Sequence, residues 1–408
     1  MRTLHASDHV VVVGAGLAGW RFIEALRRDG YEGAITLVGD EPHLPYDRPP
    51  LSKQVLSGKW GVDKAALATP EQIEQYEVTL RLGSAATGLD VAATTVHLDS
   101  GETLSATHVV IATGTRARTL QFSAGDRVRA LRNRDDAVAL EAAIAGLRPG
   151  DSVAVIGGGF IGAEAATSLH ARGLRPIVFE AAPRPLLTIL GPDVSSWLEG
   201  LSAQAGIELR NEQHILDVVA VEDGLVVVMD DGSSLAVGAV ITGVGAVVND
   251  EWLATSGLTI DNGVVVDENL LATERVGAIG DVARFMWRNP LGTELVRIEH
   301  WQVANDHATH LARYWMTGVA PITALVPYFW SDQYGKKIQM LGHPRPSDEV
   351  IMVAGSLEDG KWLALYSREG VVTGVVALSQ PRALMLSKRL LDETTSLDEA
   401  LTLEPWRA

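Results

Sequence analysis

Short apolar runs of the kind found in buried strands recur along the chain, and two of them precede closely similar glycine motifs. Residues 10–13 (VVVV) precede the motif GAGLAG at residues 14–19, and residues 153–156 (VAVI) precede GGGFIG at residues 157–162. Each motif opens a segment of helical length. This order predicts two strand–helix–strand units of the Rossmann kind, and hence an α/β fold.

The chemistry of these motifs indicates dinucleotide binding. Glycines permit a tight turn and close approach of the backbone to a pyrophosphate, and the helix that follows presents free N–H groups and a positive dipole end. The strand after each motif ends in an acid, Asp40 or Glu180, placed to bind an adenosine ribose. One such motif is also compatible with a plain glycine turn, but two complete copies predict a protein that holds two dinucleotides at once.

Behind each motif the chain repeats one plan, which indicates an internal duplication. Alternating strands broken at residues 99–102 lead to a buried run at 109–111, and strands broken at 231–232 lead to a buried run at 239–242. Each repeat is therefore expected to carry a hairpin insert. A further strand at 276–280 is expected to return the chain to the first unit.

Beyond about residue 324 the pattern changes. Short strands are expected at 362–366 and 371–378, followed by a basic helix at 381–391. The expected domains are a first dinucleotide-binding domain at 1–116 and 247–324, a second at 117–246, and a C-terminal α+β domain at 325–408.

Composition narrows the function. The 408 residues, 47% of them hydrophobic, suffice for a packed core. The net charge of −17 disfavours nonspecific binding to nucleic acid or to an anionic membrane. No apolar run is long enough to span a bilayer, and residues 1–8 are polar without a signal-peptide core, so a cytoplasmic protein is expected.

The chain contains no cysteine. This excludes a disulfide, a thiolate nucleophile, a redox CxxC pair and a cysteine-held iron–sulfur cluster. Two-electron chemistry must therefore be performed by a bound organic cofactor.

Residues 45–53 (PYDRPPLSK) combine three prolines with Arg48 and Lys53. Taken alone, this string is compatible with a rigid surface loop. Together with residues 112–114 (ATG) and 279–281 (IGD), it resembles the flavoprotein pyridine-nucleotide oxidoreductases of the glutathione-reductase fold. The resemblance covers nearly the whole chain and is closest to the NADH-dependent ferredoxin reductases that serve ring-hydroxylating dioxygenases and haem-thiolate monooxygenases.

The resemblance implies that the first unit holds FAD and the second NADH. Arg132 would reach the FAD phosphates, and the alternative for it is a solvated arginine at a helix start. Asp281 would hydrogen-bond the ribityl chain, and the alternative for it is a helix N-cap, which is compatible with that role. The expected cofactor-binding residues are Gly14, Gly16, Ala18, Gly19, Asp40, Arg48, Lys53, Ala86, Thr113, Gly114, Arg132, Asp281, Trp301, Trp330, Gly157, Gly159, Gly162, Glu164, Glu180, Gly243 and Gly245.

Lys53 and Glu164 are the expected catalytic residues. By the resemblance, Lys53 lies beside flavin N5 and Glu164 pairs with it from the NADH side. A buried ammonium would favour negative charge on the reduced flavin, and the carboxylate would compensate the ammonium. A structural ion pair between domains is the alternative. Neither group needs to donate a proton, because hydride passes directly between nicotinamide and flavin.

The resemblance also places Trp301 and Trp330, the latter in WSDQ at residues 330–333, beside the flavin. Tyr328 and Phe329 are expected in the core. His300 is expected to pack or hydrogen-bond, since no set of acids and histidines with metal-ligand spacing accompanies it. No metal site is predicted.

A chain without cysteine must pass its electrons to an external acceptor, and the resemblance implies a two-iron ferredoxin. The alternatives are a rubredoxin or quinone reductase, and a redox-sensing flavoprotein like apoptosis-inducing factor. NADH is expected as the donor, because Glu180 would repel the 2′-phosphate of NADPH, although Arg184 lies nearby in sequence.

Ferredoxin is expected to dock on a basic face of the C-terminal domain. The candidate residues of this face are Lys336, Lys337, Arg382, Lys388 and Arg389. The alternative is that these side chains are solvated and bind no partner.

Overall fold

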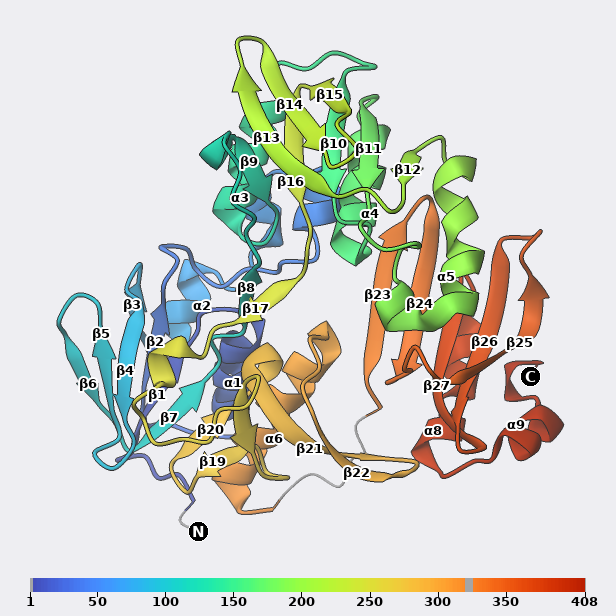
Figure 1. Ribbon diagram of the computed structural model, residues 1–408. Helices are drawn as coiled ribbons and strands as arrows, with labels where there is room; N and C mark the ends of the chain where they lie inside the picture. The colour runs from blue at the N-terminus through green and yellow to red at the C-terminus, as the bar shows by residue number, and fades with distance from the viewer. Residues whose placement is uncertain (1–2, 320–325, 408) are drawn as a thin grey trace. The chain divides into compact units, whose positions relative to one another are not determined.

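The structure is a computed structural model that describes residues 3–319 and 326–407 (Figure 1). Its contacts divide the chain into two units, each containing one of the two glycine motifs. The first unit comprises Met1–Asp47, Ala66–Arg116 and Val247–Tyr328, and the second comprises Arg48–Ala65, Ala117–Ala246 and Phe329–Ala408.

A six-stranded sheet in the order β19–β20–β7–β1–β2–β3 forms the centre of the first unit. Strand β1 (His9–Val13) lies between β2 (Ala34–Gly39) and β7 (His108–Ile111) and is parallel to both. Strand β20 (Val276–Ala278) pairs in parallel with β7, which confirms the expected return of the chain to this unit. The outer strands are β3 (Val78–Leu82) and β19 (Leu271–Thr273).

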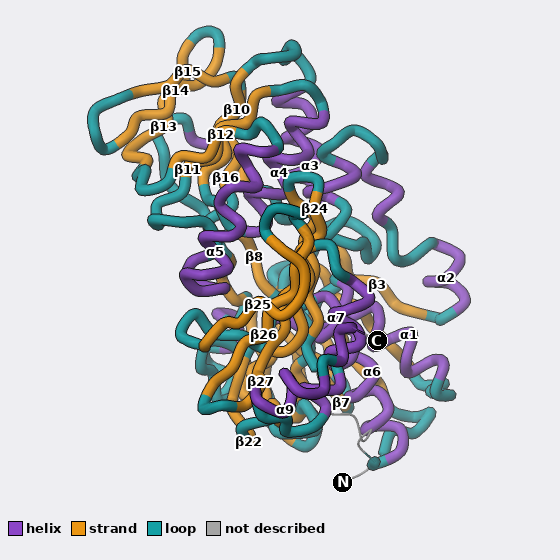
Figure 2. Tube along the Cα trace, turned by 90° about the vertical axis from the view of Figure 1, so that its right-hand side faces the viewer, coloured by secondary structure: helices purple, strands orange, loops and turns teal. Residues whose placement is uncertain are grey.

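Two helices pack together beside this sheet (Figures 1 and 2). Helix α1 (Leu17–Arg28) begins inside the first glycine motif, and α6 (Trp301–Thr317) follows the last strands of the unit. Both bury large aromatic side chains, and the rings of Phe22 and Trp315 meet edge to face with centroids 5.6 Å apart. Such contacts stabilise the layer that carries the motif.

The predicted hairpin insert of the first unit is present as an antiparallel sheet that is separate from the central one. A second small sheet contains β18, β21 and β22. The remaining elements of this unit are α2 (Pro70–Gln75), β4 (Ala86–Asp90), β5 (Thr95–Leu98), β6 (Thr103–Ser105), η4 (Glu251–Leu253), β18 (Val264–Val266), η5 (Gly280–Val282), β21 (Ala283–Asn289) and β22 (Gly292–Val296).

The second unit repeats the central arrangement of the first. Strand β10 (Ser152–Ile156) lies between β11 (Arg175–Phe179) and β16 (Ala239–Thr242), all parallel, just as β1 lies between β2 and β7. Helix α4 (Phe160–Ala171) begins inside the second glycine motif. The sheet is completed by β12 (Glu208–Arg210) and β9 (Val128–Ala130). The internal duplication predicted from the sequence is thus visible in the strand order.

The other elements of this part of the second unit include the second hairpin insert, an antiparallel sheet of β13 (Ile215–Val221), β14 (Gly224–Met229) and β15 (Ser234–Val237). Strands β8 (Thr115–Ala117) and β17 (Ala246–Val248) lie where the chain passes between the units. The helical elements are η1 (Leu51–Val55), η2 (Val62–Ala65), η3 (Gly125–Arg127) and α3 (Arg134–Ile144).

A five-stranded antiparallel sheet in the order β23–β24–β27–β26–β25 forms the C-terminal part of the second unit (Figure 1). Helix α5 (Leu187–Gln204) packs its apolar side on this sheet, where Leu190 and Val194 join a cluster with Trp362 and Tyr366. The Tyr366 hydroxyl donates to the Leu190 carbonyl at 2.7 Å. The strands are β23 (Tyr328–Gln333), β24 (Lys336–Gly342), β25 (Glu349–Ser356), β26 (Lys361–Arg368) and β27 (Val371–Leu378), so both strands predicted here are confirmed.

The basic helix predicted at 381–391 is divided. Helix α7 (Pro381–Ser387) and helix α8 (Arg389–Asp392) meet at Lys388. The Ser387 hydroxyl donates to the Ala383 carbonyl, and the Lys388 amide bonds three residues back, to Met385, instead of four. A serine that bonds back to the preceding turn bends a helix. The chain then ends in α9 (Leu397–Leu403) and η6 (Pro405–Arg407).

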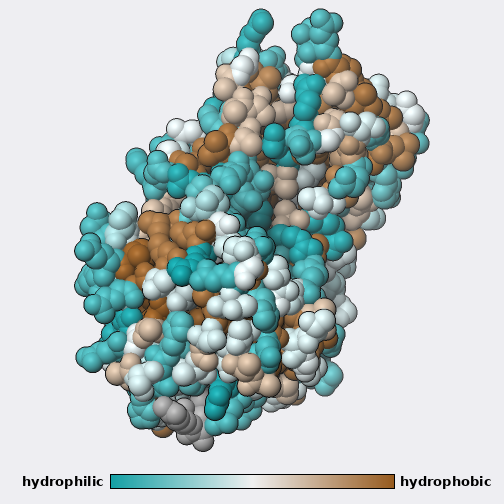
Figure 3. All heavy atoms as spheres, turned by 90° about the vertical axis from the view of Figure 1, so that its left-hand side faces the viewer, coloured by the Kyte–Doolittle hydropathy of each residue, from teal (hydrophilic) through white to brown (hydrophobic). Residues whose placement is uncertain are grey.

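Figure 3 shows one face of the molecule, on which hydrophilic residues predominate and apolar residues gather in separate patches. The exposed large apolar side chains include Leu216, Val219 and Val221, all on β13. No helix in the described residues is long and apolar enough to cross a membrane.

Candidate active site

The first glycine motif contains glycines that the fold itself requires. Gly14 has φ +121°, and a Cβ atom built on it would lie 2.2 Å from the Ala112 carbonyl oxygen. A Cβ on Gly19 would lie 2.1 Å from the Gly14 carbonyl oxygen. Both positions therefore need glycine for the turn and for close packing of helix on strand.

Gly16 has a different environment. Its φ of −87° suits any residue, and a Cβ built on it would meet no atom within 4 Å. It is the N-cap of α1, which has no side-chain cap, so the first N–H groups of the helix are available to a ligand. The open space fits a pyrophosphate that approaches the backbone, as the FAD assignment requires.

The second motif repeats this distinction. Gly157, with φ +106°, and Gly162 would place Cβ atoms 2.4 Å from the Gly243 oxygen and 1.9 Å from the Gly157 oxygen. Gly159 has φ −72°, and nothing lies closer than 4.0 Å to its Cβ position. It caps α4, again without a side-chain hydrogen bond. The second motif thus has the same open space and uncapped helix start as the first, which would suit a second dinucleotide.

The two acids at the strand ends have different surroundings. Asp40 is exposed and accepts from the amide of Glu41 at 3.1 Å. Both oxygens of Glu180 are held by backbone: Oε2 accepts from the Gly158 amide at 2.7 Å and Oε1 from the Ala182 amide at 2.8 Å. The carboxylate that would face the NADH ribose is therefore fixed in place.

On the FAD side of the prediction, several residues lie in the first unit. Thr113 donates through Oγ1 to the Asn249 carbonyl at 2.7 Å, and Gly114 has φ +62°. Asp281 lies in the single turn η5 and accepts from Thr115 Oγ1 at 3.3 Å. These contacts fix the backbone at the carboxyl ends of β7 and β20, where ligands of open α/β sheets bind.

Trp301, Ala18 and Ala86 also belong to the first unit. The Trp301 indole, at the first residue of α6, donates to Asp47 Oδ1 at 2.8 Å. Ala18 lies buried in the first turn of α1, and Ala86 begins β4 half-buried. His300 is the N-cap residue of α6. Among the described residues no group of three or more acids or histidines has an arrangement able to hold a metal ion.

Arg48 and Arg132, expected on the FAD phosphates, both lie in the second unit. Arg48 donates through Nη1 to the Arg132 carbonyl at 2.9 Å. Arg132 directly precedes Asn133, which caps α3 and forms a capping box with Asp136. Gly243 and Gly245 follow β16, where the Gly243 amide donates to the Ile156 carbonyl at 2.8 Å and Gly245 has φ +101°.

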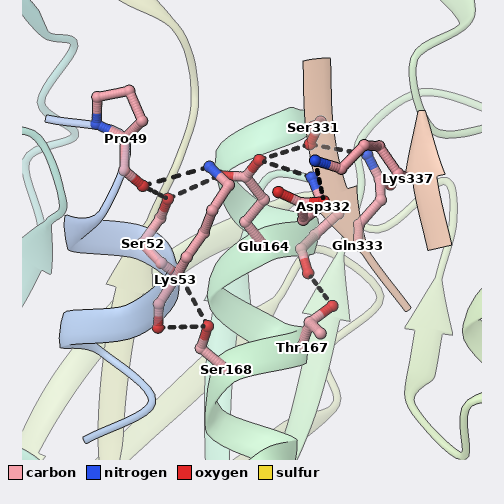
Figure 4. Close-up of polar contacts among 11 residues, drawn as sticks. Pro49, Ser52, Lys53, Glu164, Thr167, Ser168, Ser331, Asp332, Gln333 and Lys337 are labelled. Atoms are coloured by element: carbon pink, nitrogen blue, oxygen red, sulfur yellow. Dashed lines mark hydrogen bonds and ion pairs between the residues drawn. The ribbon is translucent and has the colours of Figure 1, made fainter. Parts of the chain in front are cut away.

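Lys53 and Glu164 form an ion pair of 2.7 Å between Nζ and Oε2 (Figure 4). Both belong to the second unit. Glu164 lies on the second turn of α4, and Lys53 lies in η1, a π-helical turn in which the amides of Val55 and Leu56 bond five residues back. Such wide turns are uncommon and are frequent at functional sites. The pair predicted from the sequence is therefore present.

Two serines at this ion pair were not identified from the sequence. Ser52 and Ser331 each donate a hydroxyl to Glu164, to Oε2 and Oε1 respectively, both at 2.6 Å. Both lie inside the motifs that carry the family resemblance, beside Lys53 and Trp330. The sequence signal that could have identified the two serines was their position next to the predicted site residues Lys53 and Trp330.

Trp330 and its neighbours lie on β23. Phe329 is half-buried at the edge of the C-terminal core, and its ring lies 4.5 Å from that of Phe160, the first residue of α4. Phe329 thus packs as expected. Tyr328 and Trp330 are half-buried.

Comparison with known proteins identifies the family. Residues 8–308 match the family model of pyridine nucleotide-disulphide oxidoreductases, and residues 328–406 match that of the reductase C-terminal domain. The ferredoxin reductase component of chlorobenzene dioxygenase from Cupriavidus sp. (strain PS12) is 34% identical, over 97% of this chain and 95% of that protein. Putidaredoxin reductase from Pseudomonas putida is 32% identical, over 98% and 95%.

Among solved structures, the covalent putidaredoxin reductase–putidaredoxin complex matches with a TM-score of 0.88 and 32% identity, covering 95% of this chain and 93% of that one. These matches confirm the predicted fold class and the resemblance to ferredoxin reductases of oxygenase systems. The chain belongs to the pyridine nucleotide-disulphide oxidoreductase family and carries the reductase C-terminal domain, although it has no cysteine with which to reduce a disulphide.

Proposed function

We propose that this protein is an NADH-dependent ferredoxin reductase that uses FAD and delivers electrons to a two-iron ferredoxin serving an oxygenase. One observation carries the proposal: two dinucleotide cradles, at Gly16 and Gly159, occur in a chain without a cysteine. Such a chain would take up a hydride but has no thiol of its own to receive the electrons, so they would pass to an external acceptor. Relatives that match this chain over nearly their whole length include reductase components of dioxygenase systems.

The residues of the two motifs divide between the cofactors. The N-terminus of α1 at Gly16 would hold the FAD pyrophosphate, with Asp40 on the ribose and Asp281 on the ribityl chain. The N-terminus of α4 at Gly159 would hold the NADH pyrophosphate, with Glu180 on the ribose. The lack of side-chain caps on both helices supports this division.

Bound FAD supplies the ability to accept two electrons as a hydride from NADH and to release them one at a time. The protein's part is positioning and charge. Lys53 presents a positive charge that favours the developing negative charge on the acceptor ring, and Glu164 orients the ammonium through their 2.7 Å contact. Neither residue has to transfer a proton.

A cytoplasmic location is part of this proposal, because NADH is the donor and its supply is cytoplasmic. Fractionation of cells producing the full chain checks this point.

The acceptor is tested by NADH-driven reduction across a panel of purified two-iron ferredoxins, rubredoxins and a water-soluble quinone. We expect fast turnover with at least one ferredoxin and slow turnover with the others. Preferred turnover with rubredoxin or quinone would overturn the assignment of the acceptor. A long-lived charge-transfer band after NADH addition, with little turnover on any carrier, would instead indicate a redox sensor like apoptosis-inducing factor.

A further inference from the structure

The Glu164 carboxylate is more completely held than an ion pair with Lys53 requires. Its side chain is only 3% exposed, and each oxygen has two donors. Oε2 accepts from Lys53 Nζ at 2.7 Å and Ser52 Oγ at 2.6 Å. Oε1 accepts from Ser331 Oγ at 2.6 Å and from the Asp332 amide at 3.2 Å. With four donors the carboxylate has one orientation.

The donors come from segments that are far apart in sequence and meet on one face of α4 (Figure 4). Glu164, Thr167 and Ser168 lie at positions i, i+3 and i+4 of that helix, so they share a face. Thr167 Oγ1 accepts from the Tyr334 amide at 2.8 Å, and Ser168 Oγ donates to the Ser52 carbonyl at 2.7 Å. The helix thereby holds η1 on one side and β23 on the other.

Ser331 is the key member of this network. It is fully buried, and its hydroxyl accepts from Gln333 Nε2 at 3.2 Å while it donates its one proton to Glu164. Gln333 therefore fixes the direction of the hydroxyl, and the hydroxyl fixes Oε1. Without it, Oε1 would keep only the longer contact to the Asp332 amide. A buried carboxylate that loses a donor shifts toward the donors that remain.

We propose that Ser331 is a positioning residue for hydride transfer: its hydroxyl, oriented by Gln333, sets the angle of the Glu164 carboxylate and, through it, the place of the Lys53 ammonium. The proposal rests on the proposed function insofar as FAD and NADH are the reactants. It assigns a task in the NADH half-reaction to a strand of the C-terminal domain. That task does not depend on which protein accepts the electrons.

The test uses the FAD-loaded full chain and three variants. Ser331→Ala removes the hydroxyl, Ser331→Thr retains it, and Ser387→Ala removes another fully buried hydroxyl of the same domain, one that bonds the Ala383 carbonyl. Anaerobic stopped-flow absorbance gives the limiting rate of flavin reduction and its dependence on NADH. Two further measurements are the flavin midpoint potential and the rate of Lys53 acetylation, followed by mass spectrometry.

We expect Ser331→Ala to slow flavin reduction on the order of tenfold, since one hydrogen bond to a charged group is lost. Its flavin potential and Lys53 acetylation rate should change as well. Ser331→Thr should recover most of the rate, and Ser387→Ala should match the parent in all three measurements even if its melting temperature falls. FAD content and melting temperature of each variant show whether it is folded.

Unchanged reduction rate, potential and lysine reactivity in a folded Ser331→Ala protein would overturn the proposal. Equal loss in Ser387→Ala would also overturn it, because a general destabilisation would then explain the effect. The ferredoxin assignment fails separately, in the acceptor panel. A slow Ser331→Ala variant of a protein that reduces no ferredoxin would leave this inference standing.

Discussion

Each motif contains two kinds of glycine. One kind is required by the protein's own backbone, and the other is not. Gly14 and Gly157 are required by positive φ and by neighbouring backbone, whereas Gly16 and Gly159 face open space. A methyl group at the latter positions is therefore compatible with the protein's own packing. It would occupy the volume that a pyrophosphate needs.

We predict that Gly16→Ala folds but binds FAD at least about tenfold more weakly, a loss of about 1.4 kcal/mol. Gly159→Ala should keep its FAD and lose NADH affinity by a similar factor. Flavin fluorescence and nucleotide titration measure the two affinities. Gly61→Ala, at another position with no atom within 4 Å, is the control and should change neither. Loss of FAD from Gly159→Ala would contradict the assignment of the motifs.

Glu180 leads to a prediction about nucleotide choice. Its carboxylate is fixed by two backbone amides, so it would not swing away from a 2′-phosphate. Arg184, the cation nearby in sequence, is engaged by Glu199 at 3.4 Å. We therefore expect kcat/KM for NADH to exceed that for NADPH by at least about tenfold, since like charges at this site repel.

Glu180→Ala should lower the ratio of kcat/KM for NADH to kcat/KM for NADPH. Glu199→Gln should lower this ratio less, because it only releases Arg184 from its ion pair. Glu222→Ala, which removes an exposed acid in the turn between β13 and β14, should leave it unaltered. Steady-state kinetics with both nucleotides measure the ratio. Comparable kcat/KM for NADH and NADPH in the parent protein would show that Glu180 does not select the nucleotide.

At the scale of elements, what could be predicted depended on sequence distance. The strand–helix–strand units, the hairpin inserts and two C-terminal strands, β26 and β27, were predicted correctly, because each rests on a local pattern of apolar residues and glycines. The Glu164 network could not be derived in that way. Ser52 and Ser331 lie 112 and 167 residues from Glu164, and no local pattern indicates which distant hydroxyl reaches a carboxylate.

Two helical features also could not be predicted from local sequence patterns. The π-helical turn at Lys53 gives no periodic signal over five residues. The break at Lys388 depends on which carbonyl the Ser387 hydroxyl selects. The identity of Lys53 and Glu164 as partners was available only through resemblance to a family, because neither residue type nor spacing pairs two groups 111 residues apart.

Helix α6 contains a buried histidine with a consequence for the pH dependence of stability. His307 on α6 accepts through Nδ1 from the amide of Gly280, in η5, at 3.3 Å. Burial, and secondarily the charge of His310, lower the pKa of His307 to about 3. The unfolded chain, with a histidine pKa of about 6.5, takes up a proton at pH values where the folded protein does not. The stabilisation is fully present above about pH 6.5 and is lost as pH falls toward 3.

We predict that between pH 7 and pH 5 the free energy of unfolding of the parent falls by roughly 2 kcal/mol more than that of His307→Asn. Asparagine retains an acceptor for the Gly280 amide without a proton to gain. Denaturant titrations at fixed FAD concentration measure both values. The exposed His97→Gln variant should follow the parent. If the free energy of unfolding changes with pH in the same way in the parent and in His307→Asn, His307 is not the source of the pH dependence.

At the scale of the whole molecule, charge governs encounter with an acceptor. The protein carries a net charge of −17, so an acidic ferredoxin is repelled unless positive charge is concentrated locally. The structure narrows the candidates. Lys388 pairs with Asp392 at 2.7 Å and Lys337 lies 3.4 Å from Asp332, whereas Arg382 and Arg389 are exposed and form no ion pair within the described residues.

We therefore predict that Arg382→Glu with Arg389→Glu raises the KM for ferredoxin on the order of tenfold at low salt, and that Lys388→Glu does less. Raising the ionic strength until the Debye length falls from about 10 Å to about 3 Å should weaken ferredoxin reduction in the parent and hardly affect a small neutral acceptor. Arg148→Glu is the control for net charge. If the KM for ferredoxin changes neither with salt nor with these substitutions, the α7–α8 region is not the ferredoxin docking surface.

The order of the segments along the chain determines when each cradle is complete during synthesis. The sheet behind the second motif consists of β9, β10, β11, β12 and β16, and all five strands have been translated by residue 242. The surroundings of the first motif are completed later. Strand β20 pairs with β7 and helix α6 packs on α1, and these two elements lie at residues 276–278 and 301–317. Until then β7 presents an unpaired edge, the kind of surface that nascent chains must protect from mispairing. The motif that is translated first is thus the later of the two to be finished, and FAD capture there would follow the translation of α6.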